Sequence, residues 1–426
     1  MDIMLRYWQN IRLRSNYSQV SIIYNTVERI HIYEIIQGIA MNAVLLAAGE
    51  GRRLGPLTER RPKPMIPVGN QPILESVLEA AIGAGVENFV FVVGHAQERI
   101  QSHFESGDDW GVNIQYVVQD HRLGAAHALS QVESMVDGHF LTLHGDQLID
   151  ETLISRLVER WNGTERPTMA AVQSDRPTEY GAVEVNGENV RSVSKAPTDD
   201  PPFLVNAGAY VFDDRVFDVI RDIKETADGD FGMATALQQL ADQGLLSAVL
   251  HRGPWLDLTY PWDLLRTNQA LLHGHSTDGI HDGVHETAVV SEDVALDTDA
   301  SVGPHATLLS GTSVGRNARI GANAVLSNCI VFDGARIGDG AVLHDCIIGE
   351  AASVGPNVTV EGGPARVILD DTVHRKVDLG GVVADRARLG GNVTVTPGTV
   401  VGREVQVDSG SVIQGEIQSG ETVRRA

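Results

Sequence analysis

The amino-acid sequence predicts an α/β fold in two parts, a doubly wound Rossmann-like domain followed by a parallel β-helix. In the first part, short apolar runs alternate with segments of helical periodicity, as in sheets whose strands are joined by helices. From Val284 onward, apolar residues instead recur every six residues. We therefore expect an N-terminal extension over residues 1–40, an α/β domain over 41–275 and a β-helix over 276–426.

The N-terminal extension differs in composition from the rest of the chain. It is rich in Ile, Tyr, Arg and Asn, and arginines and polar residues interrupt every apolar stretch, so it does not read as a secretory signal. Met41 directly precedes the first apolar strand. We expect translation to begin at Met41, with residues 1–40 being an upstream artefact or a disordered arm.

The α/β domain is predicted from the alternation of strand and helix patterns. A glycine at position 85 follows the first helical segment as a stop signal. Strands are expected at 44–46, 88–94, 114–118 and 140–143, helices at 73–84, 98–104 and 124–135, further strands within 168–215, and helices at 215–225 and 234–243. Such sheets bind ligands at the carboxyl ends of their strands.

The composition restricts the partners and the compartment. A net charge of −23 makes nucleic acid and anionic membranes poor partners, no run is long enough to span a membrane, and two cysteines are too few for a disulfide framework. We therefore expect a cytoplasmic protein. The acidic excess, with only four lysines, suggests a halophilic source. In such a chain, a lysine within a motif, such as Lys63 or Lys195, is less typical of the general surface.

A glycine-rich turn follows the first strand and has the parts of a polyphosphate site. The small residues Ala48, Gly49 and Gly51 would expose backbone amides, while Arg53 and Lys63 add positive charge. A lone Gly-x-Gly is more often an ordinary turn, and no Gly-Lys-Ser/Thr follows to make a Walker loop.

The longer pattern is more specific. Gly-x-Gly-x-Arg-Leu-x-Pro-Leu-Thr over residues 49–58, followed by Pro-Lys-Pro-Met over 62–65, resembles the nucleotide-binding signature of the sugar-1-phosphate nucleotidylyltransferases. The resemblance implies transfer of a nucleoside monophosphate from UTP or dTTP to glucose 1-phosphate or N-acetylglucosamine 1-phosphate, with release of pyrophosphate. It makes Arg53 and Lys63 catalytic and assigns the amides of Ala48, Gly49 and Gly51 to the nucleotide.

The same resemblance assigns further donor-site residues. Gln119 and Gly124 would contact the base, and the carboxylates Asp146 and Asp257 would be catalytic and hold Mg²⁺. Asp146 follows the strand 140–143, at the edge where a metal beside a triphosphate would lie. The structural alternatives are that Asp146 caps the next helix and that Asp257 anchors a loop.

The sugar-phosphate side is predicted from three short segments. Gly181 lies in a Tyr-Gly segment, Lys195 in a Ser-Lys-Ala-Pro segment and Asn206 in an Asn-Ala-Gly segment that resemble the family's sugar-binding stretches. Ser194 stands where the family has a sugar-binding Glu, which leaves the sugar open.

The β-helix is predicted from a repeat of six residues with small side chains two positions before each apolar one. It resembles left-handed β-helices, in which three hexapeptides make one coil. Residues 362–380 are expected to break the ladder, and Cys329 and Cys346, seventeen apart, to be stacked small hydrophobes. The repeated apolar positions are Val284, Val290, Leu296, Val302, Leu308, Val314, Ile320 and Leu326.

Two alternatives to a monofunctional enzyme remain. Many such β-helices are acyltransferases that use acetyl-CoA, and His344 precedes a stretch resembling the catalytic coil of bifunctional nucleotidylyltransferase/acetyltransferases; His305 and His374 are further candidates. A pure scaffold is slightly favoured over acetyl transfer. The other alternative is a regulatory, non-catalytic subunit. We expect a homo-oligomer formed through the β-helix, for which a trimer is one candidate arrangement.

Overall fold

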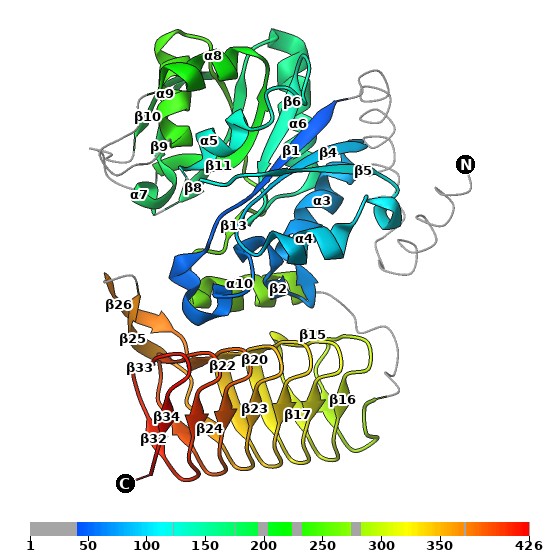
Figure 1. Ribbon diagram of the computed structural model, residues 1–426, viewed down its shortest axis with the longest axis vertical. Helices are drawn as coiled ribbons and strands as arrows, with labels where there is room; N and C mark the ends of the chain where they lie inside the picture. The colour runs from blue at the N-terminus through cyan, green and yellow to red at the C-terminus, as the bar shows by residue number, and fades with distance from the viewer. Residues whose placement is uncertain are drawn as a thin grey trace.

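The computed structural model describes residues 41–121, 123–174, 176–194, 203–223, 232–273, 283–369 and 372–425. The N-terminal extension and Lys195 lie outside these residues. The α/β domain stands on one long side of the β-helix (Figure 1). No helix in the described ranges is long and apolar enough to cross a membrane.

The α/β domain is built on a nine-stranded sheet with the strand order β5-β4-β1-β6-β11-β8-β12-β10-β9. Its first four strands are parallel, β11 runs antiparallel to both of its neighbours in that order, and this mixed sheet confirms the predicted doubly wound part. The strands are β1 (Asn42–Ala47), β4 (Asn88–Val93), β5 (Asn113–Val118), β6 (Phe140–His144), β8 (Thr168–Ser174), β9 (Ala182–Asn186), β10 (Asn189–Ser194), β11 (Phe203–Phe212) and β12 (Ser247–Leu250).

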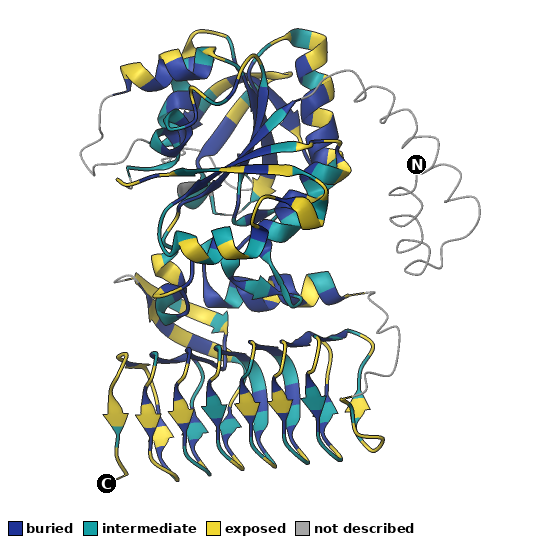
Figure 2. Ribbon diagram, turned by 45° about the vertical axis from the view of Figure 1, so that its right-hand side comes forward, coloured by how far each residue is buried: buried dark blue, intermediate teal, exposed yellow. Residues whose placement is uncertain are grey.

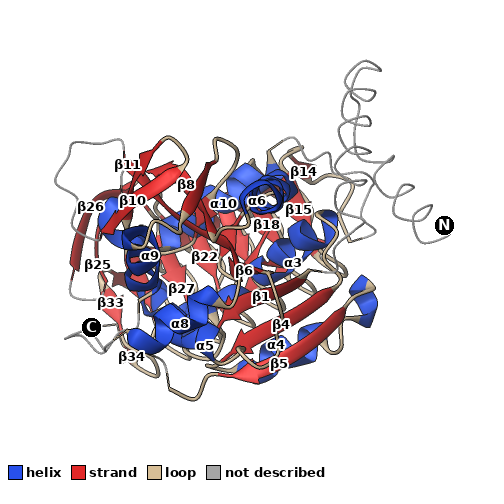
Figure 3. Ribbon diagram, turned by 90° about the horizontal axis from the view of Figure 1, so that it is seen from above, coloured by secondary structure: helices blue, strands red, loops and turns tan. Residues whose placement is uncertain are grey.

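Helices cover both faces of this sheet (Figure 3). Side chains of successive β1 residues point to opposite faces, so Leu45 packs in one apolar layer while Val44 and Leu46 pack in the other. The first layer contains α3 (Ile73–Gly83), α4 (Gln97–Phe104) and α6 (Glu151–Thr164), and the second contains α5 (Ala125–Ser130), α8 (Arg215–Asp222) and α9 (Met233–Asp242).

Two local predictions are corrected. The helix expected over 124–135 ends at Ser130. Asp146 does not begin the next helix, because the short strand β7 (Gln147–Leu148) intervenes and α6 starts only at Glu151. Asp150 is the cap of α6, since its Oδ1 accepts a hydrogen bond from the Leu153 amide at 2.9 Å. Asp146 is therefore not occupied by helix capping.

The second domain is a parallel β-helix, as the six-residue repeat predicts. Thr307 pairs with Val325 on the next coil, 18 residues further along the chain, and Val325 pairs with Val342, 17 residues further along. The residues of the repeat point inward, with Leu308, Val314 and Leu326 fully buried in one apolar column. Cys329 pairs with Cys346, and their sulfur atoms lie 3.6 Å apart inside that column.

The coils of the β-helix have three faces. The first is formed by β14 (Val289–Val290), β17 (Thr307–Leu308), β20 (Val325–Val331), β22 (Val342–Ile348), β24 (Thr359–Val360), β29 (Thr394–Val395) and β32 (Val412–Ile413). The second is formed by β15 (Val294–Leu296), β18 (Thr312–Val314), the later halves of β20 and β22, β27 (Gly381–Val383), β30 (Thr399–Val401) and β33 (Glu416–Ile417). The third is formed by β16 (Ser301–Val302), β19 (Arg319–Ile320), β21 (Arg336–Ile337), β23 (Ser353–Val354), β28 (Arg388–Leu389), β31 (Gln406–Val407) and β34 (Thr422–Val423).

The interruption at 362–380 does not break the ladder, contrary to the sequence prediction. β22 pairs with β27, and β24 pairs with β29, so the coil closes around the inserted residues. The insertion forms an antiparallel hairpin of β25 (Pro364–Leu369) and β26 (Thr372–Asp378). This hairpin rises from the β-helix toward the α/β domain (Figure 2).

The two domains share an apolar core. On the second face of the β-helix, Ile330, Phe332 and Ile347 point outward and pack in the same cluster as Leu54 and Leu264 of the α/β domain. Helix α10 (Pro261–Leu272) lies against β18, β20 and β22. The remaining elements of the α/β domain are η1 (Arg52–Thr58), η2 (Lys63–Met65), η3 (Asp108–Trp110), β2 (Pro67–Val68), β3 (Gln71–Pro72), α7 (Pro177–Tyr180) and β13 (Leu256–Asp257).

Candidate active site

The candidate site lies at one edge of the nine-stranded sheet. Because β1, β4, β5 and β6 are parallel, the turns that follow them emerge at the same edge. The turn after β1 carries residues 48–51, the turn after β5 carries 119–124, and the turn after β6 carries Gly145 and Asp146. The fold therefore brings together three segments that the sequence assigned to the nucleotide.

Lys63 and the two predicted carboxylates form the centre of this site. The Lys63 Nζ lies 2.6 Å from Asp146 Oδ2 and 3.9 Å from Asp257 Oδ1. The carboxylates converge because β13 pairs antiparallel with β7, which sets Asp257 opposite Gln147, the residue after Asp146. Gln147 and Asp257 are 110 residues apart in the chain, so this pairing could not be predicted from the sequence.

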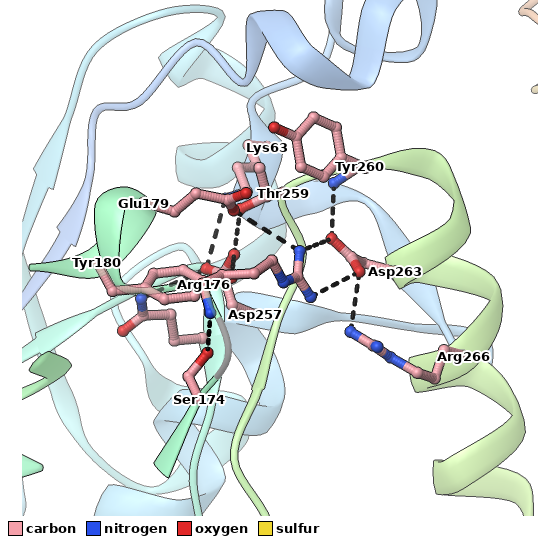
Figure 4. Close-up of polar contacts among 11 residues, drawn as sticks. Lys63, Ser174, Arg176, Glu179, Tyr180, Asp257, Thr259, Tyr260, Asp263 and Arg266 are labelled. Atoms are coloured by element: carbon pink, nitrogen blue, oxygen red, sulfur yellow. Dashed lines mark hydrogen bonds and ion pairs between the residues drawn. The ribbon is translucent and has the colours of Figure 1, made fainter. Parts of the chain in front are cut away.

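Three side chains that sequence analysis missed hold Asp257 in place, and Figure 4 labels two of them, Tyr180 and Thr259. Tyr180 donates its hydroxyl to Asp257 Oδ2 at 3.1 Å, Thr259 donates to the same oxygen, and Gln147 Nε2 lies 3.3 Å from Oδ1. Asp257 is only 5% exposed, so these bonds replace the water that its carboxylate loses on burial. Its orientation toward Lys63 is thus fixed before any ligand binds.

The charges at this centre stabilise one another. Burial alone would lower the pKa of Lys63, but the carboxylates of Asp146 and Asp257 outweigh it and the pKa is raised. Burial alone would raise the pKa of Asp146, but Lys63 outweighs it and that pKa is lowered. His144 is buried beside them, and burial lowers its pKa, so it is neutral at pH 7. The centre holds a protonated Lys63 beside the ionised carboxylate of Asp146.

The glycine turn and Lys63 depend on each other sterically. Gly51 has φ +70°, and a Cβ at this position would lie 2.8 Å from Lys63 Cβ, so only glycine fits against the lysine stem. Thr58 donates to the Gly51 carbonyl at 2.9 Å and closes the loop that carries Arg53. Arg53 is exposed, and its Cζ lies 5.9 Å from the centre of the Tyr260 ring.

Gln119 and Gly124, predicted to contact the base, lie together after β5. Gln119 is buried, and its Nε2 donates to the Gly124 carbonyl at 3.2 Å and lies 2.8 Å from His127 Nδ1. Gly124 adopts φ +99° as the residue before α5. The side chain of Gln119 is therefore oriented by the helix start that it faces.

On the predicted sugar side, Asn206 of β11 lies next to Gly181, the residue directly before β9. The Asn206 amide donates to the Gly181 carbonyl at 3.0 Å. The Asn206 side chain donates to the Tyr210 hydroxyl at 2.7 Å and accepts from Gly208 N at 3.1 Å, at an irregularity in β11. Asn206 thus shapes the backbone of β11 at this irregularity.

A buried ion-pair network lies next to this centre (Figure 4). Arg176 makes two hydrogen bonds of 3.0 Å to the two oxygens of Asp263, and Arg266 adds a third at 2.9 Å. Asp263 is fully buried and also accepts from Tyr260 N at 3.1 Å, at the start of α10. The network ties the loop after β8 to α10.

Replacing Asp263 with Ala is expected to lower the free energy of unfolding by about 3 kcal/mol, because it leaves the Arg176 guanidinium without its main anion. The matched control is Asp218→Ala, which removes an acid paired with Arg221 on the surface. That change should cost at most about 0.5 kcal/mol. Urea denaturation measures both; equal losses would show that the Asp263 network contributes no more than a surface pair.

The histidine considered for acetyl transfer lies at the base of the hairpin. Gly362 and Gly380, which flank the hairpin, pack so closely on His344 that a Cβ on either glycine would clash with it. His344 makes no side-chain hydrogen bond to any residue that the structure describes. A general base is normally oriented by such a partner, and no described residue supplies one to this imidazole. Of the other two histidines considered, His374 lies in β26 against Tyr260, and His305 lies in an exposed turn.

The fold and this edge define a nucleotidyltransferase, and comparison with known proteins agrees. Residues 42–274 match the family described as "Nucleotidyl transferase", and residues 290–419 match the "GMPPB C-terminal domain". The first match covers more than half of the chain, so the protein belongs to the nucleotidyl transferase family, which confirms the resemblance predicted from the signature.

The chain is similar to several curated relatives. It is 26% identical over 404 residues to the "Bifunctional protein GlmU" of Methanococcus aeolicus, a match that covers 89% of this chain and 96% of the relative. It is 31% identical to the "Low-salt glycan biosynthesis nucleotidyltransferase Agl11" of Haloferax volcanii, over 60% of this chain and 71% of the relative. A crystal structure of a putative glucose-1-phosphate thymidylyltransferase from Bacillus anthracis superposes with TM-score 0.51 at 25% identity, over 55% of this chain and 95% of that chain.

Proposed function

We propose that this protein transfers a nucleoside monophosphate from a nucleoside triphosphate to a sugar 1-phosphate and releases pyrophosphate. The observation that carries the proposal is the placement of Lys63 between Asp146 and Asp257 at the sheet edge, directly against the glycine turn. A regulatory subunit without activity would not need this arrangement, in which a lysine and two carboxylates are held ready by hydrogen bonds.

The donor would bind along the turns after β1 and β5. The amides of Ala48, Gly49 and Gly51 and the guanidinium of Arg53 would hold the β- and γ-phosphates, with the base near Gln119 and Gly124. Lys63, now paired with Asp146, would neutralise the charge that builds on the α-phosphate.

The residues at the centre fit Mg²⁺. Among the described residues, no group of three or more His, Cys, Asp or Glu side chains converges on one point, so a metal cage made by protein alone is not formed there. Mg²⁺ typically binds one or two carboxylates together with substrate phosphates, and Asp146 and Asp257 supply two that already face a cation, the Lys63 ammonium. When bound, the ion would offset phosphate charge.

The reaction places few demands on acid–base chemistry. A sugar 1-phosphate is already an anion, so its oxygen can attack the α-phosphorus without loss of a proton to a base. The protein must instead bring two anions into line and offset their charge. Gly181 and Asn206 would face the sugar phosphate, and Lys195, which lies outside the described residues, is proposed to pair with its phosphate.

Arg53→Ala is expected to lower kcat/KM for the triphosphate by roughly 10²-fold or more, because a charged donor to the β- and γ-phosphates is lost. Arg52→Ala is the matched control, since Arg52 is exposed and pairs with Glu50 instead. Steady-state pyrophosphate release measures both variants. Equal activity of the two would remove Arg53 from the donor site.

A substrate panel tests the proposed function directly. Nucleoside triphosphates, including UTP and dTTP, are paired with glucose 1-phosphate, N-acetylglucosamine 1-phosphate and other sugar 1-phosphates, and pyrophosphate is measured. We expect Mg²⁺-dependent release with at least one pair. No release with any pair, from a folded protein, would overturn the proposal.

Acetyl transfer is a second candidate because relatives named as bifunctional match this chain along 89% of its length. Its residue would be His344, with acetyl-CoA as co-substrate. The assay measures acetylation of glucosamine 1-phosphate by the wild type and by His344→Ala. Equal rates in the two proteins would remove His344 from the reaction, and no rate in the wild type would leave the β-helix without this activity.

A further inference from the structure

We propose that Arg61 is a positioning residue that fastens the loop bearing Lys63 to the β-helix, so that the second domain sets the geometry of the catalytic centre. The inference rests on the proposed function only in giving Lys63 a catalytic role. It assigns a part in nucleotidyl transfer to Glu350 and Asp385, which belong to the turns of the β-helix and have no place in the substrate site described above.

Arg61 is buried at the interface between the domains. It is 5% exposed, its Nη2 lies 2.7 Å from Glu350 Oε2 and 3.5 Å from Asp385 Oδ2, and its Cζ lies 4.8 Å from the centre of the Phe332 ring. An arginine so enclosed cannot reach a substrate phosphate. Its charge instead serves the contact between the domains.

The β-helix presents these two acids as a fixed pair. Asp385 Oδ1 accepts a hydrogen bond from the Glu350 amide at 2.8 Å, which locks the turns of two neighbouring coils together. Arg99 of α4 also donates to Glu350 Oε2, at 3.0 Å. Glu350 is therefore held by two arginines of the α/β domain, and Arg61 is bound to a rigid partner rather than to a mobile surface acid.

The link from Arg61 to Lys63 is short and stiff. Pro62 lies between them and Pro64 follows, and prolines fix φ. The turn is closed by hydrogen bonds from Met65 N to the Pro62 carbonyl at 2.9 Å and from Ile66 N to the Lys63 carbonyl at 3.1 Å. A shift of Arg61 would therefore move the Lys63 stem, which packs on Gly51 of the phosphate loop.

The test compares Arg61→Met with Arg60→Met, a change at the neighbouring exposed arginine. We expect Arg61→Met to lower kcat by roughly 10- to 100-fold, the scale of an ångström misplacement, with little change in KM. Arg60→Met should match the wild type, and Arg61→Lys should recover part of kcat. Glu350→Gln and Asp385→Asn, whose substituted residues both belong to the β-helix, should each lower kcat as well, and less than additively with Arg61→Met.

A second readout does not need turnover. The chain has four lysines, so trace acetylation followed by peptide mass spectrometry resolves each one. Without substrates, Lys63 should react several-fold faster in Arg61→Met and in Glu350→Gln than in the wild type, while the exposed Lys376 of the hairpin serves as the internal reference.

The outcomes separate the two proposals. If the wild type shows no turnover but Lys63 is labelled faster in the variants, the proposed nucleotidyl transfer is overturned and the positioning role of Arg61 is retained. If the wild type turns over and both kcat and Lys63 labelling are unchanged in Glu350→Gln and Arg61→Met, only the positioning role of Arg61 is overturned. If Arg61→Met does not fold, Glu350→Gln decides, because it keeps the shape of a side chain that is already 36% exposed.

Discussion

Asp146→Asn is expected to lower kcat for nucleotidyl transfer by roughly 10³-fold or more while the protein stays folded. Asp146 Oδ2 forms an ion pair of 2.6 Å with the Lys63 ammonium, and Asp146 is one of the two carboxylates that would hold Mg²⁺. Asn keeps the shape of the side chain but removes its charge, so both the cation site and the partner of Lys63 are lost. A quarter of the Asp146 side chain is exposed, which lets the amide be solvated.

The matched control for this change is Asp150→Asn, four residues further on. Asp150 caps α6, and Asn caps helices as well as Asp does, so activity and melting temperature should stay close to those of the wild type. Pyrophosphate release gives kcat, and circular dichroism gives the melting temperature. Near-normal turnover in Asp146→Asn would remove this carboxylate from the catalytic centre.

The repeat of the β-helix could be predicted because each coil obeys one local rule. Every inward position, such as Leu308 or Leu326, faces the same environment one coil after another, so the period of six appears in the sequence itself. The strands of the α/β domain are equally visible as apolar runs. The residues predicted to bind the donor lie at the ends of such runs, so the sequence places Asp146 and the turn at 48–51 at one edge of the sheet.

The partners of Asp257 could not be predicted in the same way. Tyr180 and Gln147 contact it only because β13 pairs with β7 and because α7 follows β8 at the same edge. These contacts join segments far apart in the chain, and neither residue type is distinctive alone. Thr259 had a weak signal, since it lies two residues after Asp257 and can bond back to it.

The contact between the domains is visible in the sequence as extra apolar residues, which are easily overlooked beside the repeat of six. Consecutive residues are apolar in Cys329-Ile330-Val331-Phe332 and in Cys346-Ile347-Ile348. A strand with one face in solvent needs an apolar side chain only at every second residue. Ile330 and Ile347 point outward into the shared core. The sequence gives no such signal for the burial of Arg61. Arg60 and Arg61 are the same residue type, and only the fold decides which of them is buried.

Lys63→Met is expected to lower kcat by roughly 10²- to 10³-fold and, at the same time, to enlarge the rise in melting temperature caused by Mg²⁺ alone. In the protein without substrates, the Lys63 ammonium lies between Asp146 and Asp257 and competes with a divalent cation for both. Met keeps most of the stem that packs on Gly51, yet it leaves two carboxylates facing each other without a cation. Mg²⁺ should then bind more tightly to the folded state, although catalysis has lost the charge that neutralises the α-phosphate.

Lys376→Met, in the hairpin, is the control and should change neither quantity. An Mg²⁺ response equal to that of the wild type would show that the two carboxylates do not form a cation site, and normal turnover would show that Lys63 does not act on the phosphate.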